Sequence, residues 1–257
     1  MASPSPFWGP STSHANFCEE DYVVTRYIAE FINTLTNLVY IFYAIYGIRH
    51  LHRQSNKDVF RALPYWGLMG VGIASAAFHM NLKYHTQMMD DVSMLLTTTP
   101  VLHRVMTVNT SRRTSTILAI LLSAALLGLV VVHVLTDELI LHSVTFVVSV
   151  TIIGVRTMQL ITTRTPKDSL ARRQIWGMVR FGAAIFELGF LVWLVDGWHI
   201  CTGVGAYIFI AVIDHLVSGE DVEAIEYSFA WPAPWASRSI FAGKGSAVGV
   251  RLELKTE

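Results

Sequence analysis

Long apolar segments, separated by short polar connections, run through most of the chain. A membrane-spanning helix needs about 20 such residues, and seven segments reach or approach that length. They cover residues 27–48, 59–78, 88–108, 117–135, 140–161, 181–195 and 198–217. The pattern predicts an all-α integral membrane protein, a bundle of seven transmembrane helices.

The remaining residues are predicted to form a loop and a tail around one membrane domain. The N-terminal residues lack the basic stretch and apolar core of a cleaved signal peptide, and they contain three prolines. We therefore expect an N-terminal loop over residues 1–26, a membrane domain over 27–217 and a C-terminal tail over 218–257.

Composition agrees with a membrane location. Of the 257 residues, 53% are hydrophobic and only 15% are charged, and the mean hydropathy is +0.46. A soluble domain carries about 25% charged residues. The net charge is zero and no basic patch is present, so we expect no nucleic-acid partner, and nothing implies an obligate protein partner.

Basic residues gather in alternate connections and so predict an orientation. Only Arg26 and Lys83 fall on the side of the N-terminus. Because cytosolic loops are enriched in Lys and Arg, we place the N-terminus in a lumen or outside and the C-terminus in the cytosol. The basic residues of the cytosolic connections are Arg49, Arg53, Lys57, Arg61, Arg104, Arg112, Arg113, Arg156, Arg164, Lys167, Arg172, Arg173 and Arg180.

Four polar residues at the lumenal ends of three segments indicate possible chemistry, because ionisable groups in a membrane are costly. Ser75 and His79 are four residues apart and share a helix face, Asp90 opens the next segment, and His199 opens the last. Two histidines at one depth favour a zinc site, which takes three protein ligands. Asp90 would then hold or deprotonate the zinc water, and Ser75 would hydrogen-bond the oxyanion. The alternative is a pair of interfacial histidines bonded to backbone or water.

A second group of oxygen ligands precedes and enters the first segment. Such ligands suit calcium, which takes six to eight oxygens. The alternative is a solvated acidic loop with Glu30 hydrogen-bonded to Asn33 or Asn37. The group consists of Asn16, Glu19, Glu20, Asp21 and Glu30.

Other polar and small residues have simpler interpretations. Glu187 is interpreted as a buried acid bonded to a neighbouring helix rather than as a proton relay, and Gly203 and Gly205 are expected to allow close helix packing. Two cysteines, Cys18 and Cys201, cannot define a disulfide framework. Histidines at segment ends need no special role; these are His85, His133, His142 and His215.

Four parts of the chain together resemble the alkaline ceramidase family of seven-span intramembrane hydrolases. The first is Trp8-Gly9-Pro10 followed by Phe17-Cys18-Glu19-Glu20-Asp21-Tyr22. The second is Tyr27-Ile28-Ala29-Glu30-Phe31 with Asn33. The others are the block from Ser75 to Asp90 and Trp198-His199 with Thr202-Gly203.

The resemblance implies a zinc amidase that cleaves ceramide, dihydroceramide or phytoceramide into a sphingoid base and a fatty acid. It implies a multi-pass protein of the endoplasmic reticulum and/or Golgi membrane. His79 and His199 match zinc ligands, Asp90 matches the residue bonded to the zinc water, and Ser75 matches the oxyanion stabiliser. The matches to a calcium site are Asn16, Phe17 through its carbonyl, Glu19, Asp21 and Glu30.

The chain departs from the family pattern before its last helix. The family carries a second histidine four residues before the position of His199, where this chain has Val195. It also has a long loop there, with a cysteine that can pair with the one at Cys18. We therefore predict a deletion between the sixth and seventh segments, with Asp196 as a possible substitute zinc ligand. Asn16, where the family more often has aspartate, is a smaller departure.

One consequence of the shortened connection is geometric. A single helix over 181–217 would be far longer than the bilayer is thick. Either Asp196-Gly197 forms a very tight hairpin or the two segments do not both cross.

The sequence thus leaves three functions open. The leading one is a zinc-dependent ceramide amidohydrolase. The second is a family member that binds lipid without cutting it. The third is a seven-span receptor or haem-binding protein with His79 and His199 as axial ligands.

Overall fold

The chain folds into a bundle of long helices. The computed structural model describes residues 5–53, 59–136, 139–192 and 197–218. Within those ranges it contains α1 (Phe31–Thr36), α2 (Leu38–Arg53), α3 (Val59–Asn81), α4 (Tyr84–Met106), α5 (Arg112–Thr136), α6 (Leu139–Arg164), α7 (Leu170–Leu191) and α8 (Trp198–Val217).

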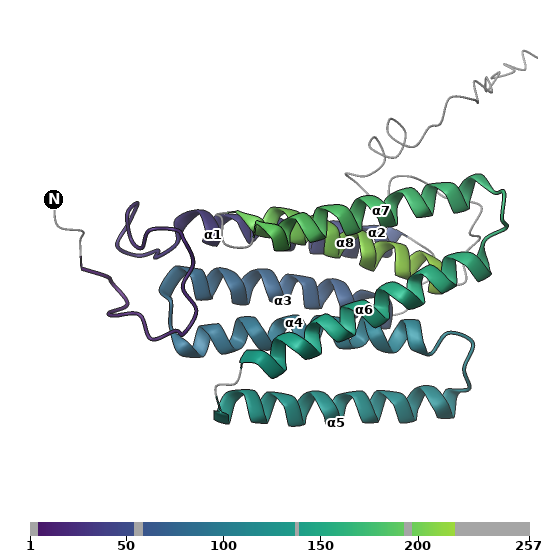
Figure 1. Cartoon of the computed structure of the whole chain (residues 1–257), viewed down its shortest axis with the longest axis horizontal. Coiled ribbons are helices and arrows are strands. Elements are labelled where there is room, and N and C mark those ends of the chain that lie inside the picture. The colour runs from purple at the N-terminus through teal and green to yellow at the C-terminus, as the bar shows by residue number, and fades with distance from the viewer. Residues whose placement is uncertain (1–4, 54–58, 137–138, 193–196, 219–257) are drawn as a thin grey trace, which may run out of the picture.

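Helices α1 and α2 are nearly continuous, so the bundle has seven rods lying side by side (Figure 1). Each rod overlaps one of the seven predicted segments, and the all-α prediction is confirmed. The sixth segment is predicted too late in the chain: α7 begins at Leu170, so Arg172, Arg173 and Arg180 lie in the helix and not in the connection before it. The first helix begins later than predicted, at Phe31. Residues before it bind the end of α3 instead, because Ala29 N donates to Met80 O at 2.9 Å and Glu30 N donates to His79 O at 2.9 Å.

Four rods are long and apolar enough to cross a membrane, which is the pattern of a helical membrane protein. Helices α3, α4 and α7 are of similar length but less apolar; α4, for example, contains three consecutive threonines and two aspartates. Seven spans and their orientation therefore stay predictions. The four are Phe31–Arg53, Arg112–Thr136, Ile140–Arg164 and Trp198–Val217.

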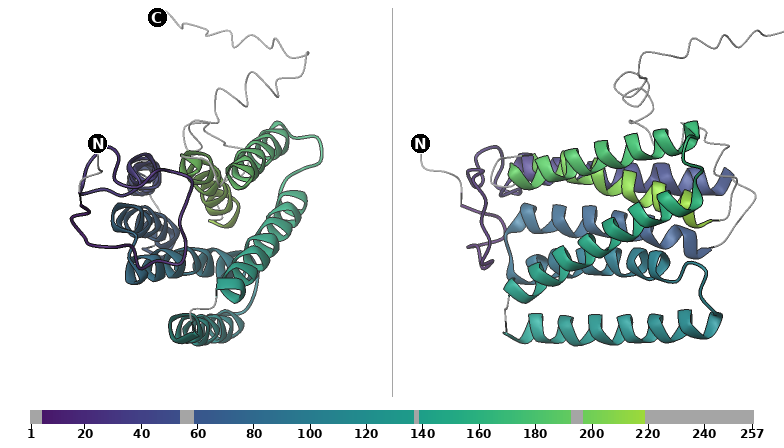
Figure 2. Two further views of the ribbon diagram at one scale, coloured as in Figure 1. Left: turned by 60° about the vertical axis from the view of Figure 1, so that its left-hand side comes forward. Right: turned by 45° about the vertical axis from the view of Figure 1, so that its right-hand side comes forward.

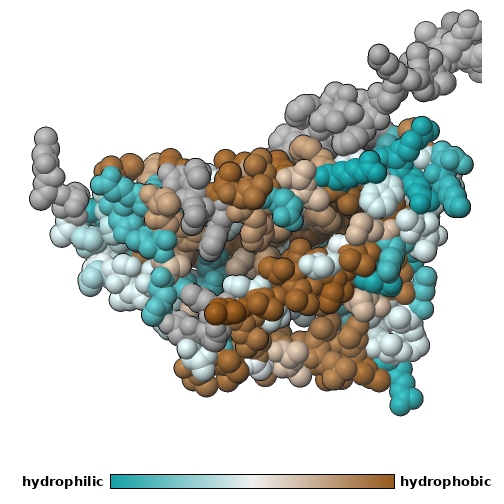
Figure 3. All heavy atoms as spheres, in the orientation of Figure 1, coloured by the Kyte–Doolittle hydropathy of each residue, from teal (hydrophilic) through white to brown (hydrophobic). Residues whose placement is uncertain are grey.

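The visible surface supports this interpretation. Hydrophobic side chains cover its middle, and hydrophilic side chains gather at both ends (Figure 3). Helix α5 lies at the edge of the bundle (Figure 2) and exposes Ile120, Leu121 and Leu127. Such a face suits lipid rather than water.

The densest packing joins α3 to α4 and α2, and α7 to α8. The hydrophobic core between these helices includes Tyr65 and Leu68 of α3, Ile175 of α7, and Tyr207 and Ile208 of α8, all nearly or fully buried. This core fixes the depth of α3 relative to α8, which are the helices that carry the candidate histidines.

Glycines of α8 allow the close packing that the sequence predicts. A Cβ on Gly205 would lie 2.7 Å from the Cβ of Phe186 in α7. A Cβ on Gly203 would lie 3.2 Å from Cγ1 of Val39 in α2. Both positions therefore bring α8 nearer to its neighbours than a larger residue would permit.

Helices α7 and α8 form an antiparallel pair joined by a short connection. Gly182 faces Ile208. Gly189, nearer the C-terminal end of α7, faces Thr202, nearer the N-terminal end of α8. Helix α8 begins after Gly197, whose φ of +81° is easily adopted only by glycine. The antiparallel packing excludes a single long helix over 181–217. The predicted hairpin itself, with Val195 and Asp196, lies outside the described residues.

The N-terminal segment, residues 5–30, covers one end of the bundle (Figure 1). Thr12 N and Ser13 N donate to Leu82 O in the α3–α4 turn at 3.0 and 3.1 Å. Gln87 Oε1 of α4 accepts from His14 N at 2.8 Å. This segment brings the predicted calcium ligands to the same end as Ser75 and His79.

A buried ionic network ties the helices together at the opposite end. Asp214 of α8 accepts two hydrogen bonds from Arg61 of α3, at 3.1 and 2.7 Å, and one from Arg104 of α4 at 2.8 Å. Arg61 and Asp214 are almost fully buried. Two of the basic residues that predict the orientation therefore serve an internal role as well.

Candidate active site

Helices α3 and α8 bring a serine and two histidines together. The ring centroids of His79 and His199 are 4.8 Å apart, with the ring planes nearly perpendicular at 83°. Ser75 Oγ lies 3.5 Å from His199 Nε2. All three side chains are buried. The predicted meeting of these residues at one end of the bundle is therefore present in the fold.

Each histidine is held through its Nδ1 atom. His79 Nδ1 bonds to Glu30 Oε2, and His199 Nδ1 lies 3.1 Å from Thr36 Oγ1. His79 Nε2 is buried without a hydrogen-bond partner in the described structure. Metal-binding histidines commonly show this arrangement, with one ring nitrogen fixed by an oxygen and the other presented to the ion.

Glu30 lies immediately before α1, not within a helix, and is fully buried. Besides His79, its carboxylate accepts from Phe17 N at 3.2 Å and from Asn33 Nδ2 at 3.1 Å. The bond to Asn33 is one that the sequence allowed. The bond to His79 places Glu30 between the two predicted metal sites.

Asp90 of α4 completes the group. Its carboxylate is within hydrogen-bonding reach of the Ser75 hydroxyl, and its side chain is partly buried. An acid, a hydroxyl and two imidazoles from three helices thus share one site, which is a set of groups suited to proton transfer and to stabilisation of a developing negative charge.

The acidic group of the N-terminal segment lies beside this site. Glu19 accepts hydrogen bonds from Ile32 N at 2.6 Å and Asn33 N at 2.9 Å, so it satisfies free amides at the start of α1. Asp21 Oδ1 is buried with no hydrogen-bond partner in the described structure. Burial raises the pKa of the Asp21 carboxyl above its ordinary value, and the nearby charges of Glu30 and Glu19 raise it further.

The structure brings Glu19, Asp21 and Glu30 together, whereas Asn16 and Glu20 are exposed. Over the ranges that the structure describes, no group of three or more His, Cys, Asp or Glu side chains is arranged to hold a metal ion. Asp196, the predicted substitute zinc ligand, lies outside those ranges. Two zinc ligands therefore fit the described site.

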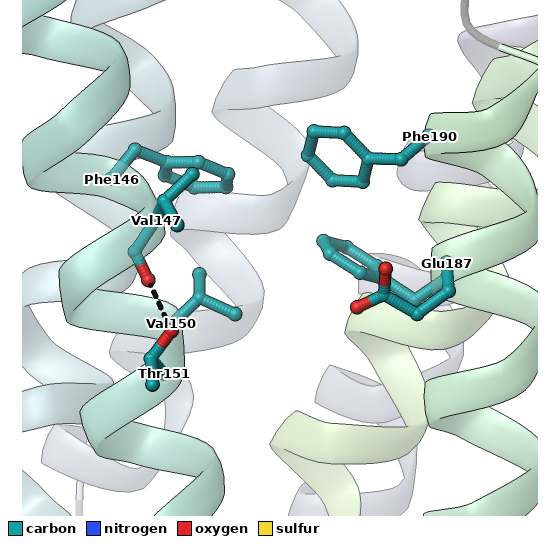
Figure 4. A pocket seen from close by; sticks show the side chains of 7 residues that line it. Phe146, Val147, Val150, Thr151, Glu187 and Phe190 are labelled. Atoms are coloured by element: carbon teal, nitrogen blue, oxygen red, sulfur yellow. Dashed lines mark hydrogen bonds between the residues drawn. The ribbon is translucent and has the colours of Figure 1, made fainter.

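One other prediction from the sequence is wrong. Glu187 is exposed and forms no hydrogen bond with the described residues, so it is not a buried acid bonded to a neighbour. It lines a cleft of about 150 Å³ between α6 and α7 and points toward the space between the helices (Figure 4).

Sequence reasoning also gave no role to His133 and His142, although both are buried against Asp91, the residue after Asp90. Their distance along the chain from Asp91 hid the contact. Of the two cysteines, Cys18 is exposed and Cys201 is half-buried, and neither forms a disulfide with a described residue.

Fold and site together define a helical membrane protein with a buried polar centre at one end. The family model named Ceramidase matches residues 9–197. The chain is 27% identical to alkaline ceramidase YPC1 of Saccharomyces cerevisiae, over 96% of this chain and 90% of the yeast protein. It is 30% identical to alkaline ceramidase 3 of Mus musculus, over 79% of this chain and 84% of the mouse protein. The chain belongs to the ceramidase family.

The match to the yeast protein also bears on the shortened connection. It extends over 287 positions, more than the 257 residues of this chain, so the yeast protein contains segments that this chain lacks. The family-model match ends at Gly197, immediately before α8. Neither match says where along this chain those segments are missing, so the deletion before the last helix stays a prediction.

Proposed function

We propose that the protein is a zinc-dependent ceramide amidohydrolase. The observation that carries the proposal is the meeting of Ser75, His79, Asp90 and His199 at one end of an apolar helix bundle. Its relatives are named alkaline ceramidases. The substrates would be ceramide, dihydroceramide or phytoceramide, and the products a sphingoid base and a fatty acid.

The two histidines would hold the zinc ion through their Nε2 atoms. Glu30 and Thr36 occupy the Nδ1 atoms, and His79 Nε2 has no other described partner in a fully buried position. When bound, zinc would polarise the amide carbonyl and lower the pKa of a water molecule. The donor set suits zinc, which binds neutral imidazole well.

Asp90 and Ser75 would supply the remaining chemistry. Asp90 would take a proton from the attacking water and deliver it to the departing amine of the sphingoid base. The Ser75 hydroxyl would donate a hydrogen bond to the amide oxygen as negative charge develops there. Their mutual contact orients both groups before the substrate arrives.

We propose Asp196 as the third zinc ligand, in place of the histidine that Val195 replaces. It lies three residues before His199, close enough in sequence to reach the same site. The test is the variant Val195→His in both the parent and the Asp196→Asn background. If Asp196 is a ligand, Asp196→Asn lowers zinc affinity and Val195→His restores it; an Asp196→Asn protein with unchanged zinc affinity contradicts the assignment.

We also propose a calcium ion in the N-terminal segment. Glu19, Asp21 and Glu30 would supply carboxylate oxygens, with Asn16 and the carbonyl of Phe17 beside them. The unpartnered oxygen of Asp21 and the crowding of three acids favour a cation there. A bound calcium ion would relieve their repulsion and fix residue 17 against Glu30.

The cleft between α6 and α7 offers lipid a sideways route from the bilayer. Its walls are formed mainly by Phe146, Val147, Phe186 and Phe190, which suit acyl chains (Figure 4). It lies near the turn of α8 that follows His199, because Gly189, beside Phe190, packs on Thr202. A lipid in the cleft would therefore approach the site at the depth of the histidines.

The decisive experiment uses the purified full-length protein in detergent with zinc and ceramide. We expect about one zinc per chain, and release of sphingoid base that is lost in Ser75→Ala, His79→Ala and Asp90→Asn. Cys201→Ser, a change on the same helix turn as His199, should leave release intact. Zinc without release, in protein that retains its fold, would contradict the proposed activity.

Lipid binding without cleavage is the second candidate function. It is favoured by the finding that no group of three or more His, Cys, Asp or Glu side chains among the described residues is arranged to hold a metal ion. The same preparation distinguishes the two functions. Saturable ceramide binding with no zinc and no product would show that the protein binds lipid and is not a ceramidase. A haem absorption band in the purified protein would favour the third interpretation, a haem-binding protein.

We also propose that the protein resides in the membrane of the endoplasmic reticulum or Golgi. Imaging of the tagged protein would test this location.

A further inference from the structure

Asp91 is contacted by one histidine of α5 and one of α6, helices that carry none of the four proposed catalytic and zinc-binding residues. His142 Nε2 of α6 lies 2.7 Å from the backbone oxygen of Asp91. His133 Nε2 of α5 lies 3.3 Å from Asp91 Oδ2. The two rings stack, with centroids 5.1 Å apart and planes 26° from parallel. Together these three residues form what we call the Asp91 clamp.

The clamp is a built feature and not a surface contact. His133 and His142 are 1% and 3% exposed. His133 is the buried residue of α5, whose other side chains are mostly exposed. Because burial of a polar ring is costly unless it is partnered, α5 approaches α4 here through a polar contact rather than through apolar packing.

The chemistry of the contact fixes the direction of the hydrogen bond. A backbone carbonyl only accepts, so His142 donates from Nε2. The bond is additional to the α-helical bond of that carbonyl, since Asp91 lies inside α4. It therefore restrains the backbone at Asp91 directly, whatever the side chain does.

Adjacent residues of an α-helix point about 100° apart. Asp90 accordingly faces Ser75 of α3, while Asp91 faces α5 and α6. Rotation of this turn of α4 would move both carboxylates together. Fixing Asp91 on one side of the helix thus fixes the direction of Asp90 on another.

We propose that His133 and His142 are positioning residues that, through Asp91, aim Asp90 at the substrate amide. The inference rests on the proposed function, in which Asp90 moves protons. Neither histidine touches substrate in this proposal. Misplacement of a catalytic group by about 1 Å costs on the order of a hundredfold in rate, so a restraint on the turn that carries Asp90 has a measurable effect.

The test compares His142→Leu with the loss of a matched histidine bond at the other end of α4, the helix that carries Asp90 and Asp91. His103 Nε2 of α4 lies 3.0 Å from Ser115 O of α5, so His103→Leu removes a similar bond between α4 and its neighbour far from Asp90. His142→Gln is the conservative variant, because its amide can still donate to the Asp91 carbonyl.

We expect His142→Leu to lower kcat for ceramide about tenfold to a hundredfold, with KM and zinc content unchanged. We expect His103→Leu to leave kcat near that of the parent, and His142→Gln to restore most of the loss. If Asp90→Asn abolishes turnover while His142→Leu has a normal kcat, the positioning role of the Asp91 clamp is contradicted. The proposed function is not affected by that result.

Amide hydrogen exchange over residues 88–94 supplies a readout that does not depend on turnover. We expect faster exchange in His142→Leu and unchanged exchange in His103→Leu. If the parent protein releases no sphingoid base, the proposed function fails, and the exchange result alone then decides whether His142 restrains α4. Unchanged exchange in His142→Leu would refute the restraint itself.

Discussion

At the scale of single residues, Glu30 connects the two polar clusters of the site. One carboxylate accepts from the ring of His79, the amide of Phe17 and the side chain of Asn33. It also raises the pKa of Asp21 through its charge. A change in the charge of Glu30 would therefore alter both the proposed zinc site and the proposed calcium site.

Glu30→Gln tests the first connection. Glutamine has nearly the same size but no charge, so it binds and orients the His79 ring less strongly. We expect zinc affinity and ceramide turnover to fall by about ten- to a hundredfold, measured by titration against a chelator. Glu20→Gln, an exposed glutamate in the same segment, should change neither. Equal zinc affinity in Glu30→Gln and the parent would show that the contact does not support metal binding.

The raised pKa of Asp21 predicts a pH dependence of calcium binding. Protons compete with calcium for its carboxylate, so calcium affinity should fall as the pH drops through that raised pKa. Without calcium, the folded state binds this proton more readily than the unfolded state, and acidification toward that range should stabilise the protein. The measurement is the unfolding temperature with calcium and with chelator from pH 8 to pH 4.5.

Asp21→Asn should abolish the calcium-dependent rise in unfolding temperature. Asp168→Asn, an exposed aspartate in the connection before α7, should retain it. A calcium effect that survives Asp21→Asn undiminished would place the ion elsewhere.

Sequence reasoning found some of these residues for identifiable reasons. Ser75 and His79 share a helix face, and a family resemblance linked them to Asp90 and His199. It gave no role to Thr36 or His142, because their partners lie on other helices and no local pattern marks them. Contacts between distant segments are set by packing rather than by spacing.

At the scale of helices, the α7–α8 pair depends on small residues where the two backbones meet. A Cβ on Gly205 would lie 2.7 Å from Phe186 Cβ and 2.9 Å from Gly182 O. Gly154 of α6, by contrast, has open space around it. The chain therefore offers a matched pair of glycines that differ only in their surroundings.

We expect Gly205→Leu to force α7 and α8 apart and to cost about 1–3 kcal/mol of stability, or to prevent folding. The same substitution should move His199 away from Ser75 and reduce ceramide turnover. Gly154→Leu should fold normally. Thermal unfolding in detergent makes the comparison, and equal unfolding temperatures for the two variants would mean that α7 and α8 are not packed as described.

The α6–α7 cleft leads to a prediction about lipid preference. Glu187 has no hydrogen bond to the described residues, so it can accept one from a hydroxyl on an entering acyl chain. Charge-assisted hydrogen bonds contribute about 1.5–3 kcal/mol. We expect Glu187→Leu to lower kcat/KM for a 2-hydroxyacyl ceramide about tenfold relative to its non-hydroxylated counterpart.

Thr151 on the opposite wall provides the control. Its hydroxyl already donates to Val147 O at 2.8 Å, so Thr151→Val should not change the ratio of the two substrates. A ratio unaffected by Glu187→Leu would mean that lipid hydroxyls do not meet this carboxylate.

Hydropathy identified the rods of the bundle well, because long apolar runs have few alternatives to helix. It missed the break between α1 and α2 and placed the first helix too early. The reason is physical: residues 27–30 lead into the apolar run, yet Ala29 N bonds to Met80 O and Glu30 N to His79 O instead. Tertiary hydrogen bonds overrode local preference.

At the scale of the whole molecule, polar interactions are concentrated at the two ends of the bundle. One end carries the candidate site beneath the N-terminal segment, and the other carries Asp214 with Arg61 and Arg104. Apolar packing joins α3 to α8 between them. The two ends can therefore be perturbed independently.

Asp214→Asn should remove the negative charge that Arg61 and Arg104 share inside the bundle and destabilise the protein by about 3–5 kcal/mol. Asp168→Asn, on the exposed connection, should cost less than about 0.5 kcal/mol. Chemical unfolding in detergent distinguishes them, and ceramide turnover of the folded Asp214→Asn protein should be unchanged. Stability equal to that of the parent would mean that the network contributes nothing.

The position of the N-terminal segment has a consequence for biosynthesis. Ser11 leaves the ribosome 71 residues before its partner Leu82, and Thr36 leaves 163 residues before its partner His199. At roughly 5–20 residues per second, the second interval lasts on the order of ten seconds. During that time Glu30 and His79 exist in a nascent chain that has no His199. The site is completed only when the last helix has been made. A transcript that stops short of α8 would therefore yield a membrane protein that contains Ser75, His79 and Asp90 but lacks His199.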